Sequence, residues 1–112
     1  MTRPSLDLMQ GTVDVLVLRT LAWQPMHGYG ISRFVRERTE GTIAIESAAL
    51  YQALHRLERR KLVRATWGVS ENNRRARFYR LTRAGQRQLE AETREWQQTT
   101  EILARFLALG EK

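Results

Sequence analysis

The residues best suited to chemistry in this sequence form a short basic stretch, Asn72–Arg80, with four arginines and two asparagines among nine residues. Alternating apolar and polar residues around it predict two strands, Val63–Trp67 and Ala76–Leu81, joined by a polar loop at Gly68–Arg75. The tip of a hairpin buries little, so its arginines are free to contact phosphates and narrow minor grooves. The stretch therefore predicts a basic wing that binds nucleic acid. The wing residues expected to make contact are Asn72, Asn73, Arg74, Arg75 and Arg77.

A second candidate is the helix predicted near Ser47–Lys61. Its leucines recur at i, i+4 and i+7 and form one apolar face, and Ser47 stands where an N-cap residue is expected. The opposite face begins with small residues, which would let the helix N-terminus enter a major groove. Gln52 suits an adenine edge, and Arg56 suits a guanine edge or a phosphate. The alternative is a solvated basic face. The residues expected to contact DNA from this helix are Ser47, Ala48, Tyr51, Gln52 and Arg56.

The overall charge supports an anionic partner. The formal net charge is +7, which suggests an anionic partner, most often nucleic acid and less often a membrane surface. However, 17 of the 19 basic residues are arginine, and a GC-rich genome also produces that skew. The charge is therefore supporting, and the argument for nucleic acid depends on the helix and the hairpin.

Residues for catalysis are scarce. The chain has no cysteine, which excludes disulfides, thiolate metal ligands and cysteine nucleophiles. Its two histidines stand alone, and His27, which precedes Gly28, is expected to be a turn or cap residue. We find no catalytic triad, carboxylate pair, phosphate-binding loop or metal-ligand spacing. We expect a protein that is not an enzyme and that uses no metal or cofactor.

The remaining elements must position the helix and the wing. After a loose arm at residues 1–8, apolar spacing predicts a helix from Val13 that ends at Trp23, before Pro25. His27–Gly30 opens a second helix, which Glu40-Gly41 ends, and Thr42–Ile45 alternates like a short strand. Thr82 is placed to cap a long helix, Arg83–Leu109.

Three helices, a hairpin and a long helix in this order predict a mainly α fold with a small β-hairpin, the winged helix-turn-helix with a C-terminal helix. We expect a DNA-binding domain at residues 1–81 and a dimerisation helix at 82–112. In the hairpin, Phe78 and Tyr79 are expected to pack within the sheet and not to stack on bases. No stretch has the ~20 apolar residues of a membrane span, so we expect a cytoplasmic protein that does not enter a membrane.

The long helix predicts a homodimer. Its residues recur every three or four positions and form a stripe that one small domain cannot cover, so a second copy is the expected partner. The alternative is a monomer whose last helix folds back on the first. The residues expected at the dimer contact, or at a small-molecule site beside it, are Leu89, Trp96, Thr100, Leu103, Phe106 and Leu107.

Taken together, these segments resemble the PadR family of regulators, specifically the short subfamily with one C-terminal dimerisation helix. The resemblance runs through Gln10–Leu18, His27–Ile31, Leu50–Glu58, Trp67-Gly68 and Asn73–Gly85. It implies a homodimeric repressor acting at its own or a neighbouring promoter and released by small hydrophobic or aromatic compounds.

The resemblance also implies roles for individual residues. Tyr51 would face DNA, Asn73, Arg74 and Arg75 would form the wing tip, and Trp96 would lie at the dimer centre beside flat hydrophobic ligands. The chain departs from the family in having Ala48-Ala49 before, and Gln52 after, the Leu-Tyr pair, where the family often has Gly-Ser and Pro. The sequence read by the helix is therefore open. A winged-helix module that binds proteins, with incidental basic charge, is the competing hypothesis.

Overall fold

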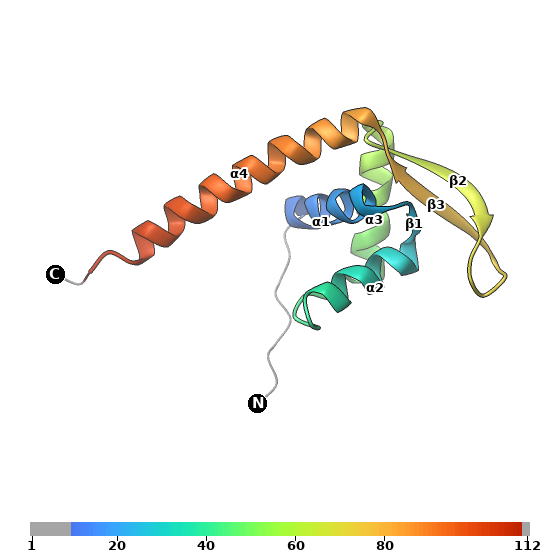
Figure 1. Cartoon of the computed structure of the whole chain (residues 1–112), viewed down its shortest axis with the longest axis horizontal. Helices are drawn as coiled ribbons and strands as arrows, with labels where there is room; N and C mark the ends of the chain where they lie inside the picture. The colour runs from blue at the N-terminus through green and yellow to red at the C-terminus, as the bar shows by residue number, and fades with distance from the viewer. Residues whose placement is uncertain (1–9, 111–112) are drawn as a thin grey trace.

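The computed structural model describes residues 10–110, and the predicted arm at residues 1–8 lies outside them. Within that range the first three helices group together, the hairpin extends to one side and the last helix extends to the other (Figure 1). This arrangement confirms the predicted winged helix-turn-helix with a long C-terminal helix. The elements are α1 (Gln10–Trp23), β1 (Met26–His27), α2 (Gly28–Arg38), α3 (Ser47–Arg59), β2 (Val63–Val69), β3 (Arg75–Leu81) and α4 (Arg83–Leu107).

The hydrophobic core fixes the orientation of α3. Leu50, Leu54 and Leu57 are buried on one face of this helix, as their spacing predicted. They join Leu18 of α1 and Ile31 of α2 in a single cluster, and each buried side chain of this size contributes about 1.5–3 kcal/mol. Because the apolar face is fixed in this way, the polar face of α3 is held toward solvent.

The hairpin is longer than the sequence predicted. β2 continues to Val69 and β3 begins at Arg75, so these two residues pair with each other where a loop was expected. A short turn closes the hairpin: the Ser70 amide donates to the Arg74 carbonyl at 2.8 Å, and Asn73 adopts a left-handed φ of 59°. Asparagine tolerates that conformation better than most residues. The polar residues of the predicted loop therefore did not mark the ends of the strands, because backbone pairing between β2 and β3 continues as far as Val69 and Arg75.

The predicted strand at Thr42–Ile45 is wrong. The structure forms the third strand at Met26–His27 instead, where β1 pairs with β3 through Met26–Tyr79 and His27–Phe78. The segment after α2 is held by a side chain, since the Thr39 hydroxyl accepts from the Ile43 amide at 3.1 Å. The alternation of apolar residues there reflects burial of Ile45 in the core and not a sheet.

Both ends of α3 differ slightly from the prediction. The N-cap is Glu46 and not Ser47, and its side chain makes no capping hydrogen bond. The helix ends at Arg59, because Lys61 takes a left-handed φ of 63° and the Leu62 amide donates back to the Leu57 carbonyl at 2.9 Å. This 6→1 bond is the usual closure of a helix before a turn.

The first turns of α4 dock on the domain and the rest of the helix does not. Thr82 caps the helix as predicted, accepting from the Gly85 amide at 3.0 Å and donating to the Lys61 carbonyl at 2.8 Å. Gly85 lies against the Leu62 backbone, where a Cβ atom would overlap the carbonyl oxygen. Beyond Leu89 the helix leaves the core and projects away from it (Figure 1).

Candidate nucleic-acid interface

The exposed face of α3 carries four of its five predicted contact residues. Ser47, Ala48, Tyr51 and Gln52 all lie in solvent on the first half of the helix. Ser47 and Ala48 are small, so the backbone at this end can approach a ligand closely. The N-terminal half of α3 therefore offers an accessible surface with hydroxyl and amide groups.

Arg56, the fifth residue, is a correction. Its guanidinium forms an ion pair with Asp14 of α1, at 2.6 Å, and the two side chains are only 21% and 11% exposed. The Arg56 Nε atom is buried and has no hydrogen-bond partner in the described part of the chain. Arg56 thus joins α3 to α1 and does not lie on the exposed face. Its charge can stay largely buried because the carboxylate of Asp14 compensates it.

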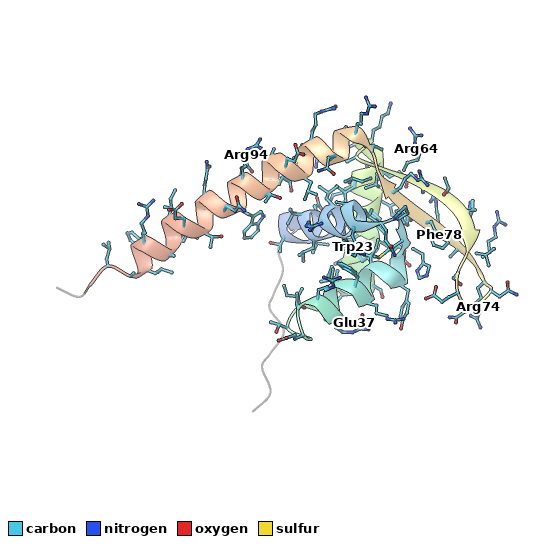
Figure 2. All side chains as sticks on the ribbon, in the orientation of Figure 1. Trp23, Glu37, Arg64, Arg74, Phe78 and Arg94 are labelled. Atoms are coloured by element: carbon cyan, nitrogen blue, oxygen red, sulfur yellow. The ribbon has the colours of Figure 1, made fainter. Side chains whose placement is uncertain are left out.

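Four predicted wing residues lie at or near the tip of the hairpin. Asn72, Asn73, Arg74 and Arg75 are exposed, and Figure 2 shows Arg74 at the tip, far from the core. Neither Arg74 nor Arg75 forms an ion pair with any residue in the range 10–110. Both charges are therefore available to an anion.

Arg77, the fifth wing residue, is partly engaged within the protein. Its guanidinium lies 2.9 Å from the Glu58 carboxylate, which connects the wing to α3. Tyr79 follows on the same face and is buried, and this burial raises the pKa of its phenol, although the charge of Arg77 opposes the change. Burial of Tyr79 confirms its predicted packing role. The main contact of Arg77 within the protein is therefore the ion pair that fixes the wing to α3.

His27 joins the wing to the start of α2. Its Nδ1 accepts from the Gly30 amide at 3.0 Å, which confirms the predicted cap, and its Nε2 lies 3.5 Å from the Glu71 carboxylate. The Glu71 backbone amide, and then His27, lower the pKa of the Glu71 carboxyl. The Phe78 ring meets the His27 imidazole edge-on, with the two ring centroids 5.2 Å apart, so Phe78 packs within the sheet as predicted.

The position of Tyr51 depends on a neighbouring glycine, Gly28, which leaves room for its ring. A Cβ atom at Gly28 would overlap the Tyr51 hydroxyl, so the absence of a side chain at the start of α2 makes room for the ring. Tyr51 then shares one cleft with the wing. Residues lining that cleft include Tyr51, Asn72, Arg74, Arg75 and Arg77.

Sequence reasoning missed two exposed aromatic residues in the same cleft. Trp67 of β2 and Tyr29 of α2 are 60% and 62% exposed. Trp67 shares a strand face with Ala65 and Val63, which looks like core packing, but the strand extends past the core at that point. The sequence did contain a signal for Trp67: an aromatic residue near the end of an alternating strand and close to an arginine-rich tip can be exposed to a ligand.

The predicted dimer residues fall into two groups. Leu89 is only 5% exposed and packs inside its own core, so its place in the predicted dimer stripe is a correction. The first turns of α4 cover α1 of the same chain, and only the later turns remain for the predicted dimer contact. The remaining predicted residues are exposed: Trp96, Thr100, Leu103, Phe106 and Leu107.

Two further observations bear on function. Residues 10–110 contain no group of three or more His, Asp or Glu side chains arranged to hold a metal ion. In the same range, no helix combines the length and the apolar character needed to cross a bilayer.

Known proteins are similar to this chain in sequence and in fold. A family model described as the transcriptional regulator PadR-like family matches residues 17–91. An uncharacterized protein of Lysinibacillus sphaericus is 30% identical over 101 residues, which cover 90% of this chain and 93% of that protein. A transcriptional regulator from Clostridium thermocellum aligns with a TM-score of 0.81 and 30% identity, over 92% of this chain and 97% of that one. A PadR family transcription regulator from Clostridium difficile aligns with a TM-score of 0.75 and 28% identity, over 86% and 98%.

Proposed function

This chain belongs to the PadR-like family of transcriptional regulators, and from that membership we propose that it is a repressor that binds a pseudo-palindromic operator as a homodimer. In this proposal residues 1–81 bind double-stranded DNA and residues 82–112 form the dimerisation helix. Its site of action is the cytoplasm, because its ligand is the operator.

One observation carries the DNA-binding part of the proposal. The exposed side of α3 and the tip of the wing open on the same cleft, which Tyr51 lines from one side and Arg74 and Arg75 from the other. A duplex that meets one of these elements therefore meets the other. Because Arg74 and Arg75 have no carboxylate partner in the described chain, their charge is free to neutralise phosphates.

Within this interface the two elements have different tasks. The start of α3 enters the major groove, where Gln52 can pair with an adenine edge and Tyr51 can reach the backbone. The wing arginines hold the adjacent phosphates or minor groove and set the register of the protein. Arg56 takes no part, because its charge is used by Asp14.

The dimer part of the proposal is supported by α4. The helix has 25 residues and spans roughly 37 Å, and its second half carries exposed tryptophan, isoleucine, phenylalanine and leucine side chains. Contiguous apolar surface of this kind is unusual on a monomer and is typical of an interface. A second copy of the same helix, related by a twofold axis, covers this apolar surface on both chains at once. The exposed residues concerned are Trp96, Ile102, Leu103, Phe106, Leu107 and Leu109.

We expect Leu103→Arg to separate the dimer into monomers. A charge buried without a partner costs several kcal/mol, so self-association should weaken by at least about 100-fold. Sedimentation velocity at several protein concentrations measures this directly. Gln97→Arg is the matched control, because the exposed Gln97 gains the same charge on the side of the helix that carries none of these apolar residues. Equal behaviour of the two variants would contradict the proposed interface.

We expect Gly28→Ala to lower DNA affinity with little effect on folding. The added methyl group would displace the exposed Tyr51 side chain, which can rotate into solvent. A loss of roughly 1 kcal/mol, or about fivefold in Kd, is expected by fluorescence anisotropy. Gly11→Ala is the control, since no atom of the described residues, apart from the adjacent backbone of its own helix, lies within 4 Å of its Cβ position. Matching affinities for the two variants would show that the position of Tyr51 does not matter.

Release of the operator is the last part of the proposal. A small hydrophobic or aromatic effector that binds between paired α4 helices near Trp96 would change the spacing of the two reading helices. Because Trp96 also belongs to the proposed dimer contact, Trp96→Ala is measured at a protein concentration at which the variant is still a dimer. There it should lose the response to such an effector and still bind the operator.

Repression itself can be tested with a reporter placed behind the sequence upstream of this chain's own gene. Expression should fall when the protein is supplied and recover with Arg74→Ala/Arg75→Ala. A rise in expression would identify an activator. An unchanged reporter, together with no binding to that duplex, would favour the competing hypothesis of a winged helix that binds proteins.

A further inference from the structure

A second groove lies between the end of α1 and the junction of β3 with α4. Its volume is about 400 Å³, and it shares no lining residue with the cleft assigned to DNA. α1 and the loop after it supply Trp23 and Pro25, whereas β3 and α4 supply Arg80 and Arg83. Arg80 lies on the face of β3 opposite to Tyr79, which lines the DNA cleft, because successive residues of a strand point to opposite faces. A duplex held by α3 and the wing tip would therefore leave this groove accessible.

The aromatic side of the groove is exposed but held in place. Trp23 is 58% exposed at the end of α1. The Arg38 guanidinium lies over the Trp23 ring, 5.5 Å from its centroid, and over the Phe34 ring, 4.8 Å from that centroid. These contacts orient the indole at the surface without burying it. An exposed tryptophan oriented in this way beside a groove is typical of an anchor residue in a protein–protein interface.

The basic side of the groove carries charges that the described part of the chain does not neutralise. Arg80 stands directly opposite Arg64 in the register of β3 and β2. Arg87 follows Arg83 by one turn of α4, and Arg83 shares a neighbouring hollow with Arg64. Within residues 10–110 none of these four arginines forms an ion pair with a carboxylate. The junction of the hairpin with α4 is therefore a concentrated positive surface.

The placement of these arginines opposes folding. Like charges directly opposite each other on antiparallel strands repel, and so do like charges four residues apart on a helix. The first turn of α4 has no acidic residue, and Arg83 lies at the positive end of the helix dipole. Glu90, on a later turn, accepts a hydrogen bond from Gln86 at 3.2 Å. Carboxylates of a bound partner would relieve these repulsions.

We propose that this groove binds an acidic segment of a partner protein, with an apolar side chain of the segment against Trp23 and its carboxylates on Arg80 and Arg83. A peptide of this kind uses both sides of the groove. Duplex DNA would meet the arginines with its phosphates but would leave Trp23 and Pro25 without an apolar partner. Because the groove and the DNA cleft lie on different faces of the hairpin, the segment and the operator can be bound together.

The test uses the full chain and a short fluorescein-labelled peptide of aspartates and glutamates around a central Phe-Leu pair. Fluorescence anisotropy should show saturable binding. The affinity should fall at least about tenfold when the acids are replaced by their amides, and likewise when the Phe-Leu pair is replaced by Ala-Ala. Trp23→Ala and Arg80→Gln/Arg83→Gln should each weaken binding of the original peptide at least about tenfold.

Two control variants match these substitutions outside the groove. Trp67 is 60% exposed and lies beside an arginine, as Trp23 does, so Trp67→Ala should leave the affinity for the peptide unchanged. Arg59→Gln/Arg60→Gln removes two exposed charges at the end of α3. Its effect should be much smaller, because exposed charges that do not contact the peptide are screened by salt.

Other occupants of the groove would give different results. The peptide should bind equally to the chain alone, to the chain saturated with operator and to monomeric Leu103→Arg. Displacement of the peptide by operator would make the groove part of the DNA surface, and loss of binding in Leu103→Arg would assign it to the dimer. Either result would overturn the proposal, as would the absence of saturable binding or an equal loss in groove and control variants. A chain that binds the peptide but no operator would contradict the proposed function and leave this assignment standing.

Discussion

Replacing Arg74 and Arg75 together by alanine is expected to weaken operator binding by roughly 10–100-fold near physiological salt. Each arginine that neutralises a phosphate contributes about 0.9 to the slope of log K against log salt, so the slope should fall by about 1.8. Fluorescence anisotropy with a labelled duplex over a salt series gives both quantities.

A matched control is available on the other face of the hairpin. Arg64 and Arg80 are exposed and stand directly opposite each other in the register of β2 and β3. Figure 2 shows Arg64 at the base of the hairpin and Arg74 at its tip. Arg64→Ala/Arg80→Ala removes the same net charge but leaves the cleft face intact, so its effect should be much smaller. If both double variants lose affinity equally, only the overall charge matters and the wing is not a contact element.

Asp14→Ala is expected to destabilise the fold by about 3 kcal/mol. The substitution leaves the Arg56 guanidinium largely buried beside α1 with no carboxylate to compensate it. Denaturant unfolding followed by circular dichroism measures the change in the free energy of unfolding. A loss below about 1 kcal/mol would place the pair among ordinary surface ion pairs.

The double variant Asp14→Leu/Arg56→Met separates stability from DNA contact. It replaces the ion pair by apolar side chains of similar size, a change that often restores stability. We expect the refolded variant to bind the operator like the wild type, because Arg56 is turned toward α1 and not outward. A large loss of DNA affinity in a stable double variant would return Arg56 to the interface.

The sequence predicted the parts of the fold that depend on local patterns. The leucine spacing of α3 correctly identified its buried face, and His27 and Thr82 both act as the caps that their types suggested. These features need only the residues within a few turns of a helix, so no tertiary information is required to read them.

The errors arise where distant segments meet. A two-residue strand at Met26–His27 has no pattern of its own and exists only because β3 offers a free edge. Arg56 looked free because its partner is 42 residues away in the sequence. Leu89 continued the spacing of the exposed stripe, but the first turns of α4 fold over α1 and bury it. In each case the residue type could be interpreted from the sequence, but the distant segment that it contacts could not.

The exposed aromatics of the cleft show the same limit. Trp67 alternates with polar neighbours as a core residue would, and only the length of the hairpin beyond the core leaves it in solvent. The functional candidates of the wing were predictable from composition, whereas the concave surface that joins Trp67 to Tyr51 depends on how the hairpin lies beside α3.

Selection of bound fragments from sheared genomic DNA is the most direct test of the central claim, that a dimer of this chain reads a specific DNA sequence with α3 and the wing. The full wild-type chain should enrich a pseudo-palindromic sequence whose half-sites lie about one helical turn, roughly 34 Å, or a multiple of that distance apart. Arg74→Ala/Arg75→Ala should reduce that enrichment. Recovery of no enriched sequence by the wild-type chain would contradict the account and leave its basic charge without a role in sequence recognition.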